Sequence, residues 1–487
     1  MLYELRFFMV AEKKQADFTN GKLLGKILWF VLPIVATNLL QTFYNAADMM
    51  IVSLSDEQNA VGAIGTTSSF IHLVVNVFIG FSVGANVTVA RHIGAKNKER
   101  TSQAVHTALI MSLVLGLIGL GVGVLISRPV LNAMGNRGNL LELAVRYCLI
   151  YFLGVPFLSL TNYLIAIFRA KGDAKTPLIV LAIAGILNVA LNFFFVLVCK
   201  MSVEGVAIAT AISNLLSTVI LIIKLRKDQD YTTFSFKKLK INVTALKDII
   251  WIGFPAGIQG ALFSLSNVLI QSSIISVNNA LAPEGSLYQP IVNGYSAATS
   301  IDTFAYTAMN AVYQGAITFT SQNMGANKPH RVKRIMYSCF LITSVIGIFL
   351  GGSIYLFRRP LLALYGVGKG ADKVLDDLAM YAAETKFLFV CIPYFLCGIM
   401  EVTTGVLRGL GKSITSTFIS LIGTCAIRVF WVAVIFPLNR TLETILWSYP
   451  ISWAITTLAA FIVIQVVLRK ILKNQRNFKI EKNISEE

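Results

Sequence analysis

Long apolar stretches separated by short polar segments run through almost the whole chain. A helix needs about 20 mostly apolar residues to cross a bilayer, because every backbone polar group must be paired inside the segment. Twelve stretches are long enough, and they predict an all-α integral membrane protein with twelve transmembrane helices. Their ranges are 27–54, 60–90, 104–127, 143–168, 177–199, 203–223, 249–277, 290–322, 335–357, 380–407, 413–437 and 443–468.

Composition supports lipid as the natural solvent. Of the 487 residues 55% are hydrophobic and 14% are charged, and the mean hydropathy is +0.70. A water-soluble chain of this length needs more charge to cover its surface. The six cysteines (148, 199, 339, 391, 397 and 425) lie in or at the ends of apolar stretches. We interpret them as small buried thiols without a metal role.

The net charge of +18 is distributed unevenly over the connections. Of the 42 Lys and Arg residues, 31 lie in the N-terminus, the even-numbered connections and the C-terminus, whereas the odd-numbered connections hold 8. Lys and Arg accumulate on the cytoplasmic side of membrane proteins. The pattern therefore predicts a multi-pass protein of the plasma (inner) membrane with both termini cytoplasmic. It indicates attraction to anionic headgroups of membrane lipid and no nucleic-acid partner.

Four sequence features of the first half return in the second half, in the same order and with slowly growing spacing. The pairs are Leu32-Pro33 with Phe254-Pro255, Gly94-Ala-Lys-Asn with Gly325-Ala-Asn, Val155-Pro156 with Ile392-Pro393, and Arg169-Ala-Lys-Gly with Arg408-Gly-Leu-Gly. Each half has six predicted helices, an even number, so both halves enter from the same side. The repeat is therefore parallel, with two six-helix lobes related by an axis along the membrane normal.

These boundaries divide the chain into five parts. We expect a cytoplasmic extension at 1–24, lobes at 25–226 and 248–470, a cytoplasmic linker at 227–247 and a cytoplasmic tail at 471–487. A site between two such lobes, reached alternately from each side, is typical of secondary transporters. The architecture favours a transporter over a channel or a receptor.

Charged residues inside the bilayer are costly and mark function. Of 24 acidic residues, only Asp48, Asp302 and Glu401 lie well inside predicted helices. Asp48 ends a stripe on one helix face that also carries Asn38, Gln41 and Asn45, spaced 3, 4 and 3 residues apart. This face must look into the bundle or into a wet cavity. A seam of hydrogen bonds between helices is the alternative to a cavity role for its amides.

Depth along the helices predicts the partners of Asp48. At ~1.5 Å per residue, Asn188 and Asn192 of the fifth helix and Thr210 of the sixth reach levels near Asp48. These four residues are the predicted ion-coupling site. The set suits either a desolvated, protonatable carboxylate or an oxygen-lined Na⁺ site, the single metal site that we expect.

The second half holds the other deep charges. Asp302 and Arg428 come to similar depth, and we predict a buried ion pair between them. Glu401 is either a cavity carboxylate or gate partner, or a helix-end salt bridge with the nearby Arg408. Tyr306 continues a helical stripe from Asp302 that packs against neighbours or forms a cation-binding wall. The predicted substrate cavity comprises Gln41, Asn45, Asn76, Gln259, Asn267, Asp302, Tyr306 and Glu401.

Other chemistry is not indicated. The chain has no phosphate loop of the form G-x-x-x-x-G-K-[ST], no His-rich metal motif and no nucleophile elbow. We therefore expect no ATP drive, no enzymatic activity and no cofactor other than a coupling ion. The expected partners are a small-molecule substrate and membrane lipid, with the protein acting as a monomer.

Several motifs together resemble the multidrug and toxic compound extrusion (MATE) transporters over residues 25–470. They are Phe43-Tyr-Asn-Ala-Ala-Asp48, the two repeat pairs that begin at Gly94 and Phe168, and Ile301-Asp302-x-Phe304. The resemblance implies efflux of amphipathic, often cationic compounds in exchange for Na⁺ or H⁺. In one branch of the family an acid in the first helix is the coupling residue, and Asp48 matches it.

The chain departs from that branch at one place. The branch carries an Asn-x-x-x-Asp pair in the fifth helix, whereas this chain has Asn188-Val-Ala-Leu-Asn192, so the coupling ion stays open between H⁺ and Na⁺. Another branch places an acid about one turn before Glu401, where this chain has Cys397.

A flippase for lipid-linked saccharides is the alternative transporter. It is disfavoured because the deep charges are mostly acidic. An intramembrane lipid-modifying enzyme is the alternative of a different class.

Overall fold

The computed structural model describes residues 17–55, 57, 60–134, 136–281, 289–369 and 372–486. Within these ranges the regular structure is helical throughout, and no residue is in a strand. The first six transmembrane segments form the N-lobe. They are α2 (Leu23–Val52), α3 (Ala60–Gly94), α4 (Lys98–Ala133), α5 (Gly138–Ala170), α6 (Lys175–Phe193) with its π-helical extension η1 (Phe194–Val198), and α7 (Val203–Lys227).

The C-lobe follows a linker that contains the short η2 (Phe236–Lys238). Its first elements are α8 (Val243–Leu281), α9 (Pro290–Gly325), η3 (Pro329–Arg331) with α10 (Val332–Leu356), and the short α11 (Arg358–Leu364). The tenth segment is α12 (Lys373–Lys386), η4 (Phe387–Cys391) and α13 (Tyr394–Gly409). The eleventh is α14 (Ser413–Ser420), η5 (Leu421–Ala426), α15 (Ile427–Phe430), η6 (Trp431–Ile435) and η7 (Phe436–Leu438), and the last is α16 (Leu442–Glu486).

All twelve predicted ranges fall on these helices. Ten helices of the described chain are long and apolar enough to cross a membrane, and the α12–α13 pair, bent by 47°, forms an eleventh span. The twelfth element of the repeat is α9, whose 36 residues include a run of buried polar side chains. The helices extend into the charged flanks, and α16 continues unbroken through the predicted tail to Glu486.

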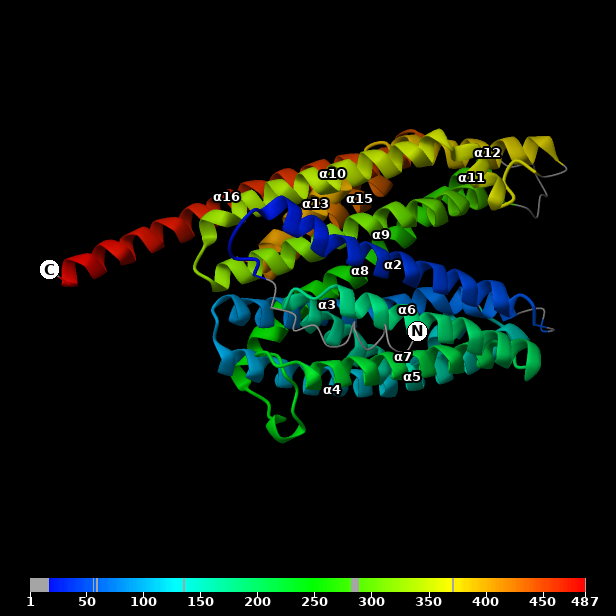
Figure 1. Ribbon diagram of the computed structural model, residues 1–487. Coiled ribbons are helices and arrows are strands. Elements are labelled where there is room, and N and C mark those ends of the chain that lie inside the picture. Colours follow the sequence, from blue (N-terminus) through cyan, green and yellow to red (C-terminus); the bar gives the residue numbers. More distant parts are fainter. Residues whose placement is uncertain are drawn as a thin grey trace.

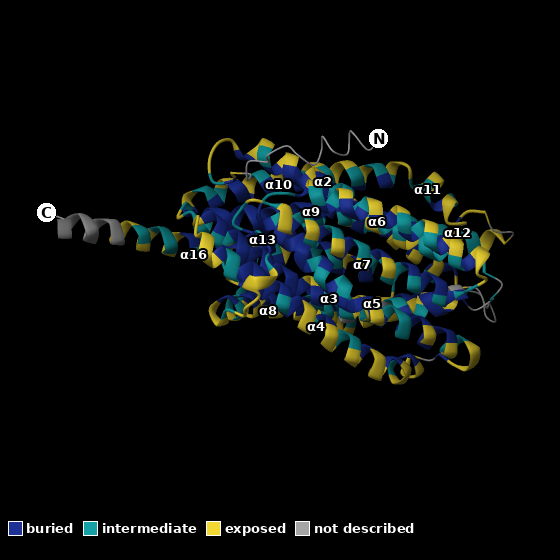
Figure 2. Cartoon of the chain, turned by 60° about the horizontal axis from the view of Figure 1, so that its bottom comes forward, coloured by how far each residue is buried: buried dark blue, intermediate teal, exposed yellow. Residues whose placement is uncertain are grey.

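The outer surface suits lipid. Large apolar side chains are exposed along α4, among them Leu117, Ile118 and Leu125. Figure 2 shows exposed residues along this helix and buried residues gathered around α13, α9 and α3. Four of the six cysteines are buried, Cys425 is half-buried, and Cys199 is exposed at the end of η1, so the prediction of a buried thiol is wrong for Cys199.

The two lobes lie side by side, and the first helix of each crosses to the other (Figure 1). The beginning of α2 packs into a C-lobe core with α9 and α10, through Ile27, Phe30 and Phe319. Reciprocally, Ile249 at the beginning of α8 packs into an N-lobe core with α3, α4 and α5. The far ends of α2 and α8 return to their own lobes. The sequence boundary at the linker is therefore not the packing boundary.

The lobes meet closely at one end of the molecule. We name it the basic end, because the connections at 95–97, 171–174 and 326–328 each carry a lysine and the adjoining helix ends add further Lys and Arg residues. There α3 and α9 end against each other: a Cβ on Gly94 would lie 2.0 Å from the Gln322 carbonyl oxygen, and one on Gly325 would lie 1.9 Å from that of Arg91. Only glycine allows this approach. The two copies of the Gly-Ala motif therefore form one pseudo-symmetric contact between the lobes.

Candidate functional site

Asp48 lies in a chain of hydrogen bonds between three N-lobe helices. The Asn192 amide donates to the Asp48 carboxylate at 2.5 Å and to the Asn188 side-chain oxygen at 3.3 Å. The Asn188 amide donates to the Thr210 hydroxyl at 3.4 Å. The four residues predicted from helical depth thus lie together. Their ion-coupling role remains a prediction.

Close packing of α2 on α6 positions this chain. Gly185 of α6 receives the ring of Tyr44, because any Cβ there would lie within 2 Å of the ring. The Tyr44 hydroxyl donates to the Ala182 carbonyl at 3.2 Å. Asp48 stands one helical turn beyond Tyr44, so this contact sets its distance from Asn192. Asn192 is fully buried and Asp48 is half-buried.

The chemistry of this hydrogen-bond chain centres on the negative charge of Asp48. Asp48 receives a single neutral amide hydrogen bond, and no described cation pairs with it. The Asn192 oxygen is buried without a hydrogen-bond partner among the described residues. A proton on Asp48 would remove the charge, and a flipped Asn192 amide would then accept that proton's hydrogen bond. The arrangement can therefore switch between two hydrogen-bonded states.

The other polar residues of the Asp48 stripe on α2 differ in their contacts along the helix. Asn38 donates to the Thr307 carbonyl of α9 at 3.3 Å, as expected for a seam between helices. Gln41 and Asn45 are exposed, and the ring of Phe43 contacts that of Phe304 of the C-lobe, tilted by 51° with centroids 5.3 Å apart. The role of the exposed Gln41 and Asn45 as substrate-cavity residues remains a prediction.

In the C-lobe the predicted pairing is wrong. Asp302 forms its ion pair with Lys386 at 2.9 Å, and both side chains are buried. Lys386 also donates to Thr299 and lies 4.2 Å above the ring of Tyr295. The depth estimate assumed regular α-helices, whereas the π-helical η5 (Leu421–Ala426) directly precedes Arg428 in the eleventh segment.

Arg428 has other partners. Its guanidinium lies 4.2 Å above the Tyr449 ring and donates to the oxygens of Asn267 and Ser452, each at 3.4 Å. The Tyr449 and Tyr295 hydroxyls are 3.0 Å apart. The Asp302–Lys386 pair and Arg428 thus belong to one polar network, in which Arg428 is connected to the pair through Tyr295 and Tyr449 rather than by direct contact.

A second C-lobe cluster surrounds Arg408. Its guanidinium donates to the Tyr313 hydroxyl and, at 2.9 Å, to the Gln259 side-chain oxygen of α8. Glu401 is buried on the same helix as Arg408, and no ion pair between them is found in the described chain. The helix-end salt bridge is therefore not formed, and the role of Glu401 as a cavity carboxylate or gate partner stays a prediction.

Comparison with known families shows to which family the chain belongs. The sequence profile of the MatE family matches residues 33–194 and 255–434, which fall on the two lobes. The chain belongs to the MatE family. This agrees with the resemblance to the MATE transporters and with a transporter rather than an enzyme.

Relatives and solved structures agree over nearly the full length. "Probable multidrug resistance protein YoeA" of Bacillus subtilis is 26% identical over 452 residues, covering 91% of this chain and 93% of the relative. "Multidrug export protein MepA" of Staphylococcus aureus is 23% identical, covering 92% and 95%. An outward-facing multidrug resistance MATE family transporter has a TM-score of 0.84 at 21% identity, covering 95% and 99%. A MOP superfamily transporter from Pyrococcus furiosus has a TM-score of 0.85 at 20% identity, covering 94% and 99%.

Within this MatE fold, the charge balance differs from the expectation. Buried acids of the C-lobe are Asp302 and Glu401, while buried bases are Lys386, Arg408 and Arg428. The deep charges of this lobe are thus not mostly acidic. Two of these bases are not among the predicted site residues: Lys386, and Arg408, which the sequence suggested only as a helix-end partner of Glu401.

The remaining predicted cavity residues contact different partners, and their role toward a substrate stays a prediction. Asn76 of α3 packs against Gly260 of α8. A Cβ added to Gly260 would lie 3.3 Å from the Cβ of Asn76. Gln259 and Asn267 bind the buried arginines. Tyr306 is more than one-third exposed, on the α9 face below Asp302. A cavity of about 650 Å³ lies at the basic end, and none of the predicted substrate residues line it.

Proposed function

We propose that this protein is a plasma-membrane antiporter that exports amphipathic organic cations in exchange for H⁺ entering at Asp48. Family membership supports efflux, since the similar proteins from Bacillus subtilis and Staphylococcus aureus carry multidrug resistance and multidrug export names. The distribution of Lys and Arg supports a cytoplasmic basic end with both chain termini on that side. Transport needs no partner chain, and the protein acts as a monomer.

One observation carries the proposal: Asp48 is held by a neutral amide of Asn192 and has no cationic partner in the described N-lobe. An uncompensated charge at low dielectric costs several kcal/mol. Protonation removes that cost, and it drives transport if the inward- and outward-facing states hold Asp48 differently.

The number of carboxylates favours H⁺ over Na⁺. Asn192 stands where the related branch carries a second acid, so Asp48 alone must carry the charge change. A metal ion prefers several oxygen ligands around it. A proton needs only one oxygen of the Asp48 carboxylate.

Uptake of a fluorescent lipophilic cation into inverted vesicles tests the proposal. We expect uptake with an acidic lumen in Na⁺-free buffer, and none with a Na⁺ gradient at equal pH. Asp48→Asn should abolish the gradient-driven uptake while the purified variant still binds the dye. Glu142→Gln, which removes the exposed partner of Arg128, is the matched control and should transport normally.

Two results would contradict the proposal. Normal uptake by Asp48→Asn under the pH gradient would remove the coupling role of Asp48. Uptake driven by Na⁺ alone would replace the proton with sodium at the same site.

A further inference from the structure

The cavity of about 650 Å³ lies at the basic end, between the beginning of α2 and the N-lobe. Its α2 wall carries Lys22, Lys26 and Trp29 on one helix face. The opposite wall is the connection at 171–175, which leads into α6 and ends in Lys175, and residues 228 and 230 of the linker close the cavity. Because α2 begins on the C-lobe and α6 belongs to the N-lobe, the cavity lies between the two lobes.

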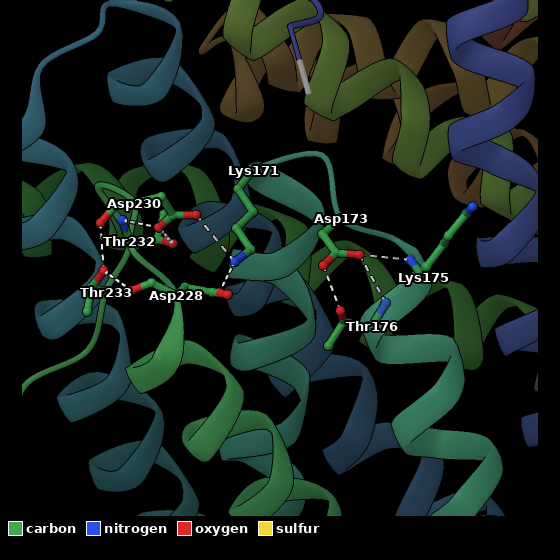
Figure 3. Close-up of polar contacts among 8 residues, drawn as sticks. All are labelled: Lys171, Asp173, Lys175, Thr176, Asp228, Asp230, Thr232 and Thr233. Carbon is green, nitrogen blue, oxygen red and sulfur yellow. Dashed lines mark hydrogen bonds and ion pairs between the residues drawn. The ribbon is translucent and has the colours of Figure 1, made fainter. Parts of the chain in front are cut away.

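The carboxylates around this cavity already have partners. Asp228 and Asp230 pair with the buried Lys171, and Asp230 also accepts from the backbone and hydroxyl of Thr232 (Figure 3). Asp173 accepts from the backbone N–H groups of Lys175 and Thr176 and so caps α6. The acids are therefore occupied within the chain.

Asp17 at the cavity edge is likewise satisfied. Desolvation acts to raise its pKa, but hydrogen bonds from Asn20 and Thr19, together with the charge of Lys26, lower the pKa to about 2. Asp17 thus stays ionised and hydrogen-bonded at neutral pH. It adds a negative charge at the rim that Lys26 offsets.

Two lysines remain without a carboxylate. Lys22 and Lys175 are exposed, and neither makes an ion pair with a described residue. Figure 3 shows the Lys175 side chain directed away from the Lys171 cluster. Lys26 donates to the backbone carbonyls of Asp17 and Asn20, which bind its ammonium group without neutralising it. The four lysines and four aspartates of the lining balance in charge, but the ammonium groups of Lys22 and Lys175 have no carboxylate beside them and are presented to an anion.

Apolar surface adjoins these charges on the membrane side. Trp29 is 72% exposed on α2, and Ile179 and Ile183 are exposed along the same face of α6 as Lys175. Tryptophan collects at the membrane–water interface. Charge at the mouth and apolar stripes below it match a headgroup with acyl chains better than a free ion.

We propose that this cavity binds the phosphate headgroup of an anionic phospholipid, with Lys22 and Lys175 contacting the phosphate from opposite lobes and the acyl chains lying along Trp29 and Ile179. The proposal rests on the proposed orientation, in which the basic end faces the cytoplasmic leaflet. A lipid held in this way bridges the two lobes where they must separate for the inward-facing state. It stabilises the state in which the basic end is closed.

Quenching of Trp29 by brominated lipids tests the site directly, in nanodiscs and without any gradient. The Trp29 signal is the difference between the wild-type protein and Trp29→Phe. We expect brominated phosphatidylglycerol to quench it at much lower mole fraction than brominated phosphatidylcholine. A basic residue near an anionic surface contributes about fivefold in binding, so Lys22→Gln with Lys175→Gln should reduce the preference roughly 25-fold.

Controls separate this site from general charge and from free phosphate. Lys237→Gln with Lys240→Gln removes two exposed linker lysines and should keep the preference. Equal quenching by both lipids, or a preference unchanged in the Lys22/Lys175 variant, would overturn the proposal. Relief of quenching by millimolar inorganic phosphate alone would assign the site to a soluble phosphate instead. Because no transport is measured, these outcomes are independent of the coupling role of Asp48.

Discussion

Asp48 and Asp302, the two intramembrane aspartates of the predicted site, are stabilised in different ways. Asp48 accepts a hydrogen bond from a neutral amide, whereas Asp302 is neutralised by Lys386 at 2.9 Å. A carboxylate with a permanent cation beside it changes its charge at a high cost, and one without it does so readily. This contrast separates a residue suited to ion exchange from a residue suited to holding the fold.

The Asp302–Lys386 pair predicts a specific pattern of stability. Removing one partner of a buried pair leaves the other charge uncompensated and costs about 3–5 kcal/mol. We therefore expect Asp302→Asn and Lys386→Gln each to lower the thermal stability of the purified protein, and Asp302→Lys with Lys386→Asp to recover part of it.

The control for this experiment is the other candidate pair. Asp302→Arg combined with Arg428→Asp should give no recovery, because Arg428 contacts Asn267, Ser452 and the Tyr449 ring instead. Recovery in that variant, measured by the same melting experiment, would restore the pairing predicted from depth alone.

These residues show where sequence reasoning succeeds and fails. The meeting of Asp48, Asn188, Asn192 and Thr210 follows from counting helical rise, because α2, α6 and α7 are regular through those positions. The same count failed for Asp302, since π-helical turns in the tenth and eleventh segments change the rise and the facing of every later side chain. Hydropathy alone carries no signal for such turns.

At the scale of elements, the contact of α3 with α9 depends on two glycines. A Cβ added at Gly94 would overpack this contact, which costs about 1–3 kcal/mol. The atoms that it would meet belong to the backbone of Gln322, which cannot move aside as a flexible side chain can. We expect Gly94→Ala to open the basic end. Hydrogen–deuterium exchange of the peptide covering 318–331 should rise about tenfold, equivalent to ~1.4 kcal/mol.

Gly121→Ala is the matched control, since nothing lies within 4 Å of its added Cβ. It should leave the exchange of that peptide unchanged. Protection as strong in Gly94→Ala as in the wild-type protein would mean that the glycine contact does not hold the basic end closed.

At the scale of the whole molecule, the hydrogen bonds between lobes in the described chain lie toward the basic end, apart from that of Asn38 to the Thr307 carbonyl near mid-depth. They include Thr318 to Asn86 at 3.2 Å and Gln322 to the Ala170 carbonyl at 2.7 Å. Alternating access requires these contacts to break in each cycle. A covalent link across them should therefore stop transport while leaving the fold intact.

We expect Asn86→Cys with Thr318→Cys, in a background without the native cysteines, to lose dye transport on oxidation and regain it on reduction. Ser112→Cys with Ser159→Cys joins α4 to α5 inside the N-lobe, where the two residues are already hydrogen-bonded at 2.8 Å. That linked control should transport normally. Full activity of the oxidised inter-lobe pair would contradict movement at this contact.

The overall architecture was largely predictable. Segment number, element type and the parallel repeat follow from hydropathy and from motif order, because lipid demands long apolar helices. The crossing of α2 and α8 between lobes was not predictable, since an apolar helix face matches either lobe equally well. The boundaries at 226 and 248 describe the repeat in sequence but not the packing of its first helices.

That crossing has a consequence for synthesis. The ribosome releases α2 first, yet the residues that cover Ile27 and Phe30, on α9 and α10, lie some 280 to 315 positions later. Until α9 and α10 emerge, the beginning of α2 lies in the bilayer without the residues that pack against it. The N-lobe likewise lacks the beginning of α8. Such distant contacts slow assembly. Neither half of the chain is therefore a complete folding unit, and a nascent chain stalled at the linker is a natural target for membrane quality control.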